Sequence, residues 1–146
     1  GDCIHGGGGQ QGSCASSTRG LIMRANSPTN SEVEFVTIST QGNGADFGDS
    51  HLQQGGAGGG SNAVRGIFAG GYKSPATSYN SISYVTIATL GNSQDFGDLT
   101  ASSGELCGLA SPTRIAWGSR LSPGNGRDDA IQYLQIMNFW YCDAFW

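Results

Sequence analysis

Lysine is almost absent from this sequence, and charged residues of both signs are scarce. Lys73 is the only lysine, and Asp, Glu, Lys and Arg make up 12% of the 146 residues, where about 25% is usual. The formal net charge is −4. Proteins that bind nucleic acid neutralise phosphates with basic side chains, so this composition argues against nucleic acid as a partner.

The sequence also lacks segments that cross membranes, hold metals or bind nucleotides. No apolar run approaches the roughly 20 residues of a membrane-spanning helix, so we expect no membrane insertion. The glycine-rich runs at 6–9 and 55–60 are not followed by the Lys-Ser/Thr pair of a phosphate loop. The histidines His5 and His51 are isolated, and no Ser/His/Asp or Cys/His constellation is evident. We therefore expect no enzymatic activity, no cofactor and no metal site.

Cysteine is sparse and fits no metal-binding spacing. The four cysteines, Cys3, Cys14, Cys107 and Cys142, include no CxxC pair. They permit three disulfide pairings, among which the sequence does not choose, and free buried thiols are the alternative. Low charge and many small polar residues favour an extracellular or virion-surface location, where disulfides persist.

Glycine is the residue in excess, with 25 copies among 146 residues against a typical fraction of about 7%. Glu and Lys, which favour helices, are few, whereas the abundant Gly, Ser, Thr and Asn suit short strands joined by tight turns. The hydrophobic content of 37% is ordinary and periodic, which argues against disorder. We predict an all-β fold.

Three residue types recur at a fixed spacing along the chain. An aromatic before a β-branched or aliphatic run appears every 49 residues, at Phe35, Tyr84 and Tyr133. A second aromatic also recurs every 49 residues, at Phe47, Phe96 and Phe145. An arginine recurs after 46 and then 49 residues, at Arg19, Arg65 and Arg114. Such self-similarity is typical of repeat architectures.

The spacing divides residues 1–146, which we take as a single repeat domain, into three units at approximately 1–47, 48–96 and 97–146. All the length variation lies between the arginine and the first aromatic, as expected of a surface loop beside fixed strands. Alternating apolar and polar residues bounded by Gly and Asn predict four short strands in each unit. In the second unit we expect these strands at 52–60, 64–70, 82–89 and 95–99.

The sequence DFGD stands at the close of the first two units, at 46–49 and 95–98. We expect its Asp to bond backbone amides in a turn, its Gly to supply an unusual backbone conformation, and its Phe to pack between units. The third unit has Ala144-Phe145-Trp146 in place of Asp-Phe-Gly, so it keeps the Phe and loses the turn residues.

The second unit resembles a kelch repeat. It places a hydrophobic strand ending in Gly70-Gly71 before a later strand that carries Tyr84, as kelch repeats do. The doublet is absent from the other units, and the closing aromatic is Phe where kelch repeats have Trp. The units are more similar still to Gly-rich kelch-like repeats found in long arrays in phage proteins, many of them presumed tail or fibre components. The resemblance implies a β-propeller-type fold of three four-stranded blades and transfers no catalytic residues.

Three blades do not close a propeller, which needs about four to eight. Two chains could form a ring of six, the chain could belong to a longer array, or its units could stack with those of other chains into a fibre. The opening Gly1-Asp2 resembles the inside of a repeat, so either processing removed a segment or the chain is part of a longer protein. The aromatic residues at 139–146 predict a surface that another chain or unit covers.

The recurrent arginines and two groups of loop residues are candidate functional residues. We expect Arg19, Arg65 and Arg114 to brace the repeat by pairing with Asp46 or Asp95 of the DFGD motifs, with a ring of anion or sugar contacts as the alternative. Aromatic and charged side chains in the loops suit ligand binding, because repeat scaffolds carry binding on length-variable segments. These candidates are Tyr72, Tyr79, Arg120 and Arg127. Trp140 and Tyr141 could add a platform for sugars, with packing as the alternative.

We therefore expect a non-enzymatic structural or adhesive protein, a component of a virion tail, a fibre or an extracellular filament. It would associate with itself or with neighbouring repeats, and its loops would touch host-surface glycans. The alternative is a secreted lectin, in which several identical chains complete a β-propeller.

Overall fold

The computed structural model describes residues 1–4, 11–24, 31–74, 77–118, 120–122, 126–137 and 143–145. Within these residues the protein is all-β, as the composition predicts, and every sheet is antiparallel. None of the described residues belongs to a helix that is long and apolar enough to cross a membrane.

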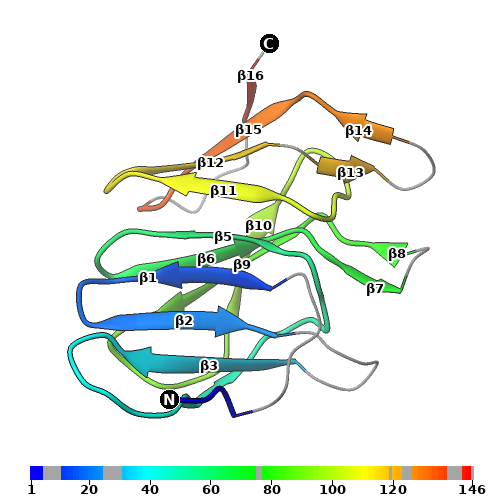
Figure 1. Ribbon diagram of the computed structural model, residues 1–146. Coiled ribbons are helices and arrows are strands. Elements are labelled where there is room, and N and C mark those ends of the chain that lie inside the picture. Colours follow the sequence, from blue (N-terminus) through cyan, green and yellow to red (C-terminus); the bar gives the residue numbers. More distant parts are fainter. Residues whose placement is uncertain are drawn as a thin grey trace.

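Each unit forms one four-stranded sheet whose strands pair in chain order. Sheet 1 contains β1 (Gly12–Ala15), β2 (Arg19–Met23), β3 (Glu32–Thr37) and β4 (Ala45–Asp49). Sheet 2 contains β5 (Gly58–Ser61), β6 (Arg65–Ala69), β9 (Ser81–Thr86) and β10 (Gln94–Asp98). Sheet 3 contains β11 (Cys107–Ala110), β12 (Arg114–Gly118), β15 (Ile131–Gln135) and β16 (Asp143–Phe145). The sheets follow one another in space, with the two ends of the chain at opposite ends of the stack (Figure 1).

Four strands per unit confirm the predicted pattern, with differences in detail. In unit 2 the first strand begins at Gly58, later than predicted, because the chain at 52–57 runs irregularly before it. The segment predicted as a loop after β6 contains a hairpin, β7 (Tyr72–Ser74) and β8 (Thr77–Ser78). Sheet 3 has a similar hairpin, β13 (Arg120–Ser122) and β14 (Gly126–Asp128). The predicted unit limits at 47 and 96 fall inside β4 and β10.

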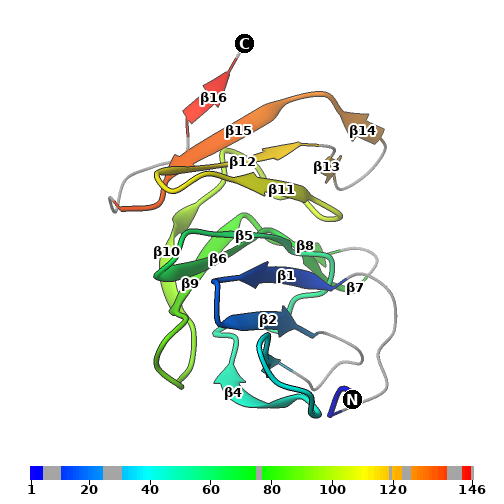
Figure 2. The same ribbon diagram turned by 60° about the vertical axis from the view of Figure 1, so that its left-hand side comes forward.

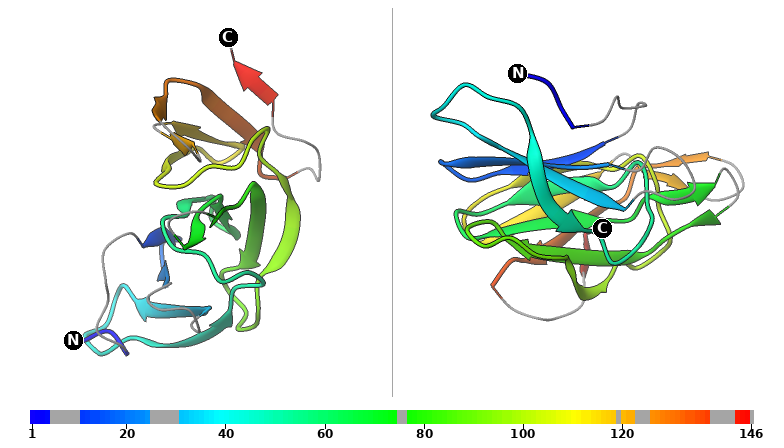
Figure 3. Two further views of the ribbon diagram at one scale, coloured as in Figure 1. Left: turned by 90° about the vertical axis from the view of Figure 1, so that its right-hand side faces the viewer. Right: turned by 90° about the horizontal axis from the view of Figure 1, so that it is seen from below.

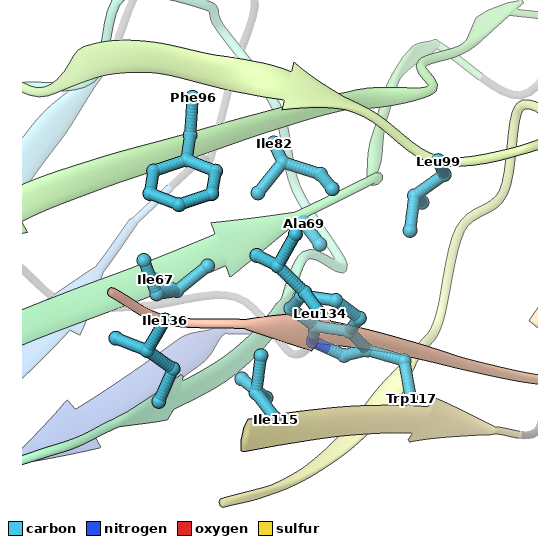
Figure 4. Close-up of a cluster of buried hydrophobic side chains, with 9 residues drawn as sticks. All are labelled: Ile67, Ala69, Ile82, Phe96, Leu99, Ile115, Trp117, Leu134 and Ile136. Atoms are coloured by element: carbon cyan, nitrogen blue, oxygen red, sulfur yellow. The ribbon is translucent and has the colours of Figure 1, made fainter. Parts of the chain in front are cut away.

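The hydrophobic core lies between the sheets and consists of two clusters. The cluster between sheets 1 and 2 contains Cys14, Leu21, Met23, Val33, Phe47, Ala57, Phe68, Val85 and Ile87. The cluster between sheets 2 and 3 contains Ile67, Ala69, Ile82, Phe96, Leu99, Ile115, Trp117, Leu134 and Ile136 (Figure 4). Neighbouring residues of a strand point to opposite faces, so Ile67 and Phe68 of β6 enter different clusters and both are fully buried.

The first strands of the three sheets, β1, β5 and β11, lie side by side (Figure 2). Glycine permits this close approach. A Cβ atom added to Gly59 would lie 2.1 Å from the carbonyl oxygen of Ser13, and one added to Gly108 would lie 2.2 Å from that of Gly59. The sheets spread outward from these strands, as the view from the side shows (Figure 3). Of the two glycine-rich runs, the one at 55–60 thus ends in the crowded inner strand β5, and the one at 6–9 lies outside the described residues.

Candidate functional site: unit junctions and end faces

The arginine that recurs in each unit joins its own unit to the next one. Arg19 in unit 1 donates a hydrogen bond from Nη1 to the carbonyl oxygen of Ile87 in unit 2, at 2.9 Å. Arg65 in unit 2 donates in the same way to Ile136 in unit 3, at 2.9 Å. Hydrogen bonds from charged donors contribute about 1.5–3 kcal/mol each. The two junctions inside the chain are thus held by the same polar contact.

An aromatic ring of the same unit lies beneath each of these guanidinium groups. The Arg19 guanidinium carbon is 4.8 Å from the centroid of the Phe35 ring, and that of Arg65 is 5.3 Å from the Tyr84 ring. Cations are attracted to the faces of aromatic rings at these distances. The ring therefore orients the guanidinium while its N–H group reaches the next unit.

The predicted arginine brace exists, but its acceptor differs from the prediction. Arg19 reaches the carbonyl oxygen of Ile87 instead of an aspartate. The Asp46 carboxylate accepts a hydrogen bond from the N–H of Gly48 at 3.1 Å. Asp46 and Asp95 are both exposed on the outer strands. The brace thus uses a main-chain acceptor, which residue identities do not reveal.

The DFGD segments form the outer strands β4 and β10, in agreement with the strand predicted at 95–99, and Asp46 bonds a backbone amide as predicted, but within its strand instead of in a turn. In both strands the register shifts at the phenylalanine, which is a β-bulge. The glycine after it has a φ of 142° at Gly48 and 150° at Gly97, a conformation that favours glycine. Phe47 and Phe96 are buried between sheets, as predicted. In unit 3, β16 pairs with β15 without a bulge, and Phe145 is opposite Ile131.

Two sides of the stack face no unit of the described chain. The side of a sheet toward the preceding unit is called leading, and the side toward the following unit is called trailing. In sheets 1 and 3, a residue is assigned to the side on which its equivalent in another unit packs at an internal junction. The leading face of sheet 1 includes Gln11, Ser13, Gly20, Val36 and Ile38, beside Ile22 and the Arg24–Glu34 pair. The trailing face of sheet 3 consists of Cys107, Leu109, Arg114, Ile131 and Tyr133.

The leading face exposes an apolar residue that the junctions bury. Ile38 is 55% exposed, whereas its equivalents in the next units, Ile87 and Ile136, are 1% and 0% exposed. Val36 is half-buried, and its equivalent Val85 is buried. The carbonyl oxygen of Ile38 is equivalent to those of Ile87 and Ile136, which accept the hydrogen bonds from Arg19 and Arg65.

The trailing face shows the same difference. Ile131 is 54% exposed, whereas its equivalents Val33 and Ile82 are both 0% exposed. Leu109 is 76% exposed, and its equivalent Cys14 is 9% exposed. Both end faces therefore carry the pattern of an internal junction without its partner.

Arg114 completes the trailing face. It is exposed, and its guanidinium carbon lies 5.4 Å from the centroid of the Tyr133 ring. In the described part of the chain this guanidinium has a ring beneath it but no hydrogen-bond acceptor. Arg114 thus lies over its ring as Arg19 and Arg65 do, and no following unit of the described chain covers it.

Residues 1–4 pack on the hairpin between β3 and β4, at the edge of the leading face. The Asp2 N–H donates to Asn43 Oδ1 at 2.9 Å. One unit later, the Asp49 N–H donates to Asn92 Oδ1 at 3.0 Å. Asp2 therefore takes the position, relative to unit 1, that the end of β4 takes relative to unit 2. Residues 1–4 occupy the place of a connection between units and contact Glu34 on the leading side of sheet 1, whereas Ile38 on that side stays exposed.

A buried ion pair lies on the same side of sheet 1. Arg24 Nε is 2.6 Å from Glu34 Oε1, and the side chains are 6% and 2% exposed. Burial acts to raise the pKa of Glu34, but hydrogen bonds from the Ile4 N–H and from Arg24 prevail and lower it. The pKa of Arg24 is raised because the interaction with Glu34 outweighs the effect of burial. The pair is charged at neutral pH.

A pocket recurs beneath the hairpin that joins the third and fourth strands. In unit 2 its volume is about 630 Å³, and in unit 1 it is about 190 Å³. The larger pocket is lined in part by the aromatic, hydroxyl and amide side chains of Tyr84, Thr86, Thr89 and Gln94. Its counterpart is lined in part by Phe35, Thr37 and Thr40, which occupy the equivalent positions. Sequence analysis did not identify this pocket, although its lining follows the 49-residue spacing.

Two of the predicted loop residues, Tyr72 and Tyr79, lie in and directly after the β7–β8 hairpin of unit 2. Tyr72 is half-buried, and its ring packs where Cβ atoms on Gly56 and Gly104 would lie 2.8 and 2.9 Å from it. Burial, and to a lesser degree the charge of Glu105, raise the pKa of Tyr72. Tyr79 is half-buried as well, and its N–H donates to the carbonyl of Gly71. Tyr72 therefore serves packing.

The remaining ligand candidates lie in or after unit 3. Arg120 and Arg127 are on the strands of the β13–β14 hairpin, where Arg120 is opposite Asp128. Trp140 and Tyr141 lie outside the described residues. Arg120 and Arg127 thus stand on a different unit from Tyr72 and Tyr79.

Three cysteines are described, and none forms a disulfide. Cys3 and Cys107 are exposed thiols, and Cys14 is a buried one. Burial raises the pKa of Cys14 to about 12, so this thiol stays protonated and acts as a small apolar residue. Cys142 lies outside the described residues. The alternative of free buried thiols thus fits Cys14, whereas Cys3 and Cys107 are free but exposed.

Neither the models of known protein families nor the curated proteins include a match to this sequence.

Proposed function

We propose that this chain is a non-enzymatic structural and adhesive repeat protein, a component of a virion tail, a fibre or an extracellular filament. The observation that carries the proposal is the repeated junction. Arg19 and Arg65 make the same contact with the following unit. Arg114 on the trailing face is the equivalent donor, and exposed Ile38 on the leading face has the equivalent carbonyl acceptor. A protein whose ends match in this way is suited to extended assembly.

The proposal includes a β-propeller-type arrangement of the kelch-like kind. Its support is the antiparallel pairing of four strands in chain order in each unit, with the first strands β1, β5 and β11 closest together. Propellers arrange four-stranded sheets around an axis in this manner and need about four to eight of them. Additional units, from this chain's neighbours or from other chains, would complete the arrangement.

The native mass of the purified protein and its electron micrographs test the proposal together. A structural role predicts assemblies of several chains, seen as rings or as filaments. A tandem fusion of two copies exposes the same end faces as the single chain. If both the single chain and this fusion remain monomeric at all concentrations, the proposal is contradicted.

A second candidate function is a secreted oligomeric lectin, and the recurrent hairpin pocket favours it. The pocket combines a ring with hydroxyl and amide groups, which is the chemistry that binds the apolar faces and hydroxyls of sugars. A glycan array tests this candidate. Saturable binding that Tyr84→Ala abolishes and Lys73→Ala preserves would support a lectin. An array without binding would remove the lectin and leave the structural role.

A further inference from the structure

We propose that the trailing face of one copy of this chain docks on the leading face of a second copy. In this contact Arg114 of one copy donates a hydrogen bond to the carbonyl oxygen of Ile38 in the other. The inference rests on the proposed structural function, and it names the partner as a second copy of the same chain. The argument comes from how the internal junctions are built.

At each internal junction, one pair of positions is too crowded for two side chains. A Cβ atom on Gly66 would lie 2.6 Å from Cys14 Sγ, and one on Gly60 would lie 2.1 Å from Ile115 Cδ1. Each internal junction thus sets a glycine on one unit against a larger side chain on the other. No room remains for two side chains at this point, because packed interiors have few voids.

The two end faces supply the same combination. The trailing face has Leu109 at the position of Cys14 and Gly60, and the leading face has Gly20 at the position of Gly66 and Ile115. Leu109 is 76% exposed, and a Cβ atom on Gly20 would meet only Val36, at 3.3 Å. A leucine on one copy therefore has a vacant glycine position opposite it on the other.

The recurrent arginine provides the polar contact at each internal junction. Arg19 and Arg65 are half-buried because the following unit covers them, and each donates to a carbonyl oxygen there. Arg114 is exposed and already lies over Tyr133, as the other two lie over their rings. Because its position is fixed by the ring, docking of a second copy would bring the Ile38 carbonyl oxygen to it.

Both the trailing and the leading face expose aliphatic side chains. Ile131 on the trailing face and Ile38 on the leading face are 54% and 55% exposed. Their equivalents inside the chain are almost fully buried. Burying an aliphatic side chain of this size contributes about 1.5–3 kcal/mol, so the docked state would gain from both.

One residue of the leading face fits less well and gives the inference a sharp test. Ser13 stands where units 2 and 3 have Gly59 and Gly108, whose added Cβ atoms would come within 2.1 and 2.2 Å of the preceding backbone. The inner strands must therefore lie farther apart at the contact between copies than inside the chain. Ser13→Gly would remove this obstacle and tighten the association.

Sedimentation over a broad range of concentrations tests the contact. We expect the wild-type chain to associate, and Leu109→Ser or Arg114→Ala to weaken the association at least about tenfold. Ser13→Gly should strengthen it. Leu90→Ser is the matched control for Leu109, because Leu90 is 60% exposed but lies on neither end face. Lys73→Ala is the control for loss of a positive charge.

The outcomes separate this inference from the proposed function. Discrete dimers or longer polymers that respond to Leu109→Ser and Arg114→Ala support it. Association that responds equally to Leu90→Ser, or not at all to the end-face variants, overturns it. A wild-type chain that remains monomeric also overturns it, whereas the proposed structural function is contradicted only if the tandem fusion of two copies remains monomeric as well.

Cross-linking gives an independent readout. Cys107 is equivalent to Gly58, whose added Cβ atom would lie 2.7 Å from Leu106 Cβ of the next unit. The leading-face residue equivalent to Leu106 is Gln11. In a Cys3→Ser background, Gln11→Cys should therefore form a disulfide with Cys107 of another copy under mild oxidation.

Peptide mapping identifies the linked residues, and Thr40→Cys is the control, since Thr40 is exposed on a hairpin away from the inner strands. Preferential 11–107 linkage between copies supports the docking geometry. Equal linkage of Thr40→Cys to Cys107 contradicts it.

Discussion

The middle sheet and the two outer sheets come from the same repeat, yet they meet different surroundings. Ile87 in unit 2 is 1% exposed and accepts a hydrogen bond from Arg19, whereas Ile38 in unit 1 is 55% exposed. Both residues follow the third strand of their sheet, and both are isoleucine. The comparison shows that the neighbouring unit, and not the local strand, determines burial at this position.

The largest expected change in unfolding free energy comes from Trp117, which is buried between sheets, whereas its equivalent Ile22 is only half-buried. Trp117 in unit 3 is 1% exposed and packs between sheets 2 and 3, and its indole N–H donates to the Gly58 carbonyl at 3.2 Å. Trp117→Ala should lower the free energy of unfolding by about 3–5 kcal/mol. Its equivalent on the leading side, Ile22, is half-buried, and Ile22→Ala should cost about 1 kcal/mol. Urea unfolding measures both, and equal losses would contradict the comparison.

The next effect is specific to unit 1, because Glu34 stands where units 2 and 3 have the neutral residues Ser83 and Gln132. Glu34→Gln should cost roughly 3 kcal/mol at pH 7, since it breaks a buried ion pair with Arg24. The pKa of Glu34 is lowered in the folded state. Its charge therefore stabilises the fold above the unfolded-state pKa, and this contribution is lost as the pH falls through the lower, folded-state pKa.

Urea unfolding at a series of pH values from neutral to acidic checks this prediction. The difference in unfolding free energy between wild type and Glu34→Gln should narrow below about pH 4, near the ordinary pKa of a glutamate. A difference that stays constant across this range would show that the Glu34 charge does not stabilise the fold.

A smaller effect separates the internal arginines from the one on the trailing face. Arg65→Ala removes a hydrogen bond to the Ile136 carbonyl and should cost about 1.5–3 kcal/mol. Arg114→Ala, measured at a concentration where the chain is monomeric, should change the unfolding free energy by less than about 0.5 kcal/mol, because the side chain is exposed. Thermal unfolding of the two variants, side by side, tests the difference. A large loss on Arg114→Ala would mean that the trailing face is already satisfied within the chain.

The smallest effect concerns a turn that units 2 and 3 share. Glu105 has a φ of 55°, and Gly56 at the equivalent position has a φ of 68°. Glu105→Gly should raise the unfolding free energy by a few tenths to about 1 kcal/mol, because the relief of left-handed strain exceeds the added flexibility of the unfolded chain. Gly56→Ala should destabilise, since its Cβ atom would lie 2.8 Å from the Tyr72 ring. Calorimetry measures both changes, and the same sign for the two would refute the explanation.

The three-unit repeat and the all-β fold could be predicted from the sequence, because both depend on which residues recur at regular spacing. The 49-residue spacing of the aromatics located three units, and Phe47 and Phe96 are buried between sheets as predicted. The hairpin β7–β8 was missed because its segment is rich in turn-forming residues and contributes no strand alternation. Local pattern was sufficient for the four strands of each sheet, and insufficient for the length-variable segments that contain β7–β8 and β13–β14.

The candidate site was only partly predictable, for a physical reason. The three recurrent arginines stood out in the sequence, but the acceptors found for Arg19 and Arg65 are backbone carbonyls, and every residue has one. The pairing of Gly60 with Ile115 was likewise hidden, because it joins residues of different units whose proximity only the packed sheets establish.

The arginine brace also implies an unequal tolerance to mutation. The donor, a guanidinium, is provided by one residue type, and replacing Arg65 removes it. The acceptor is the main chain at Ile136, so most substitutions there would leave the polar contact in place and change only the apolar packing. A library of single substitutions scored for folding should therefore accept several aliphatic residues at 136 and almost none at 65.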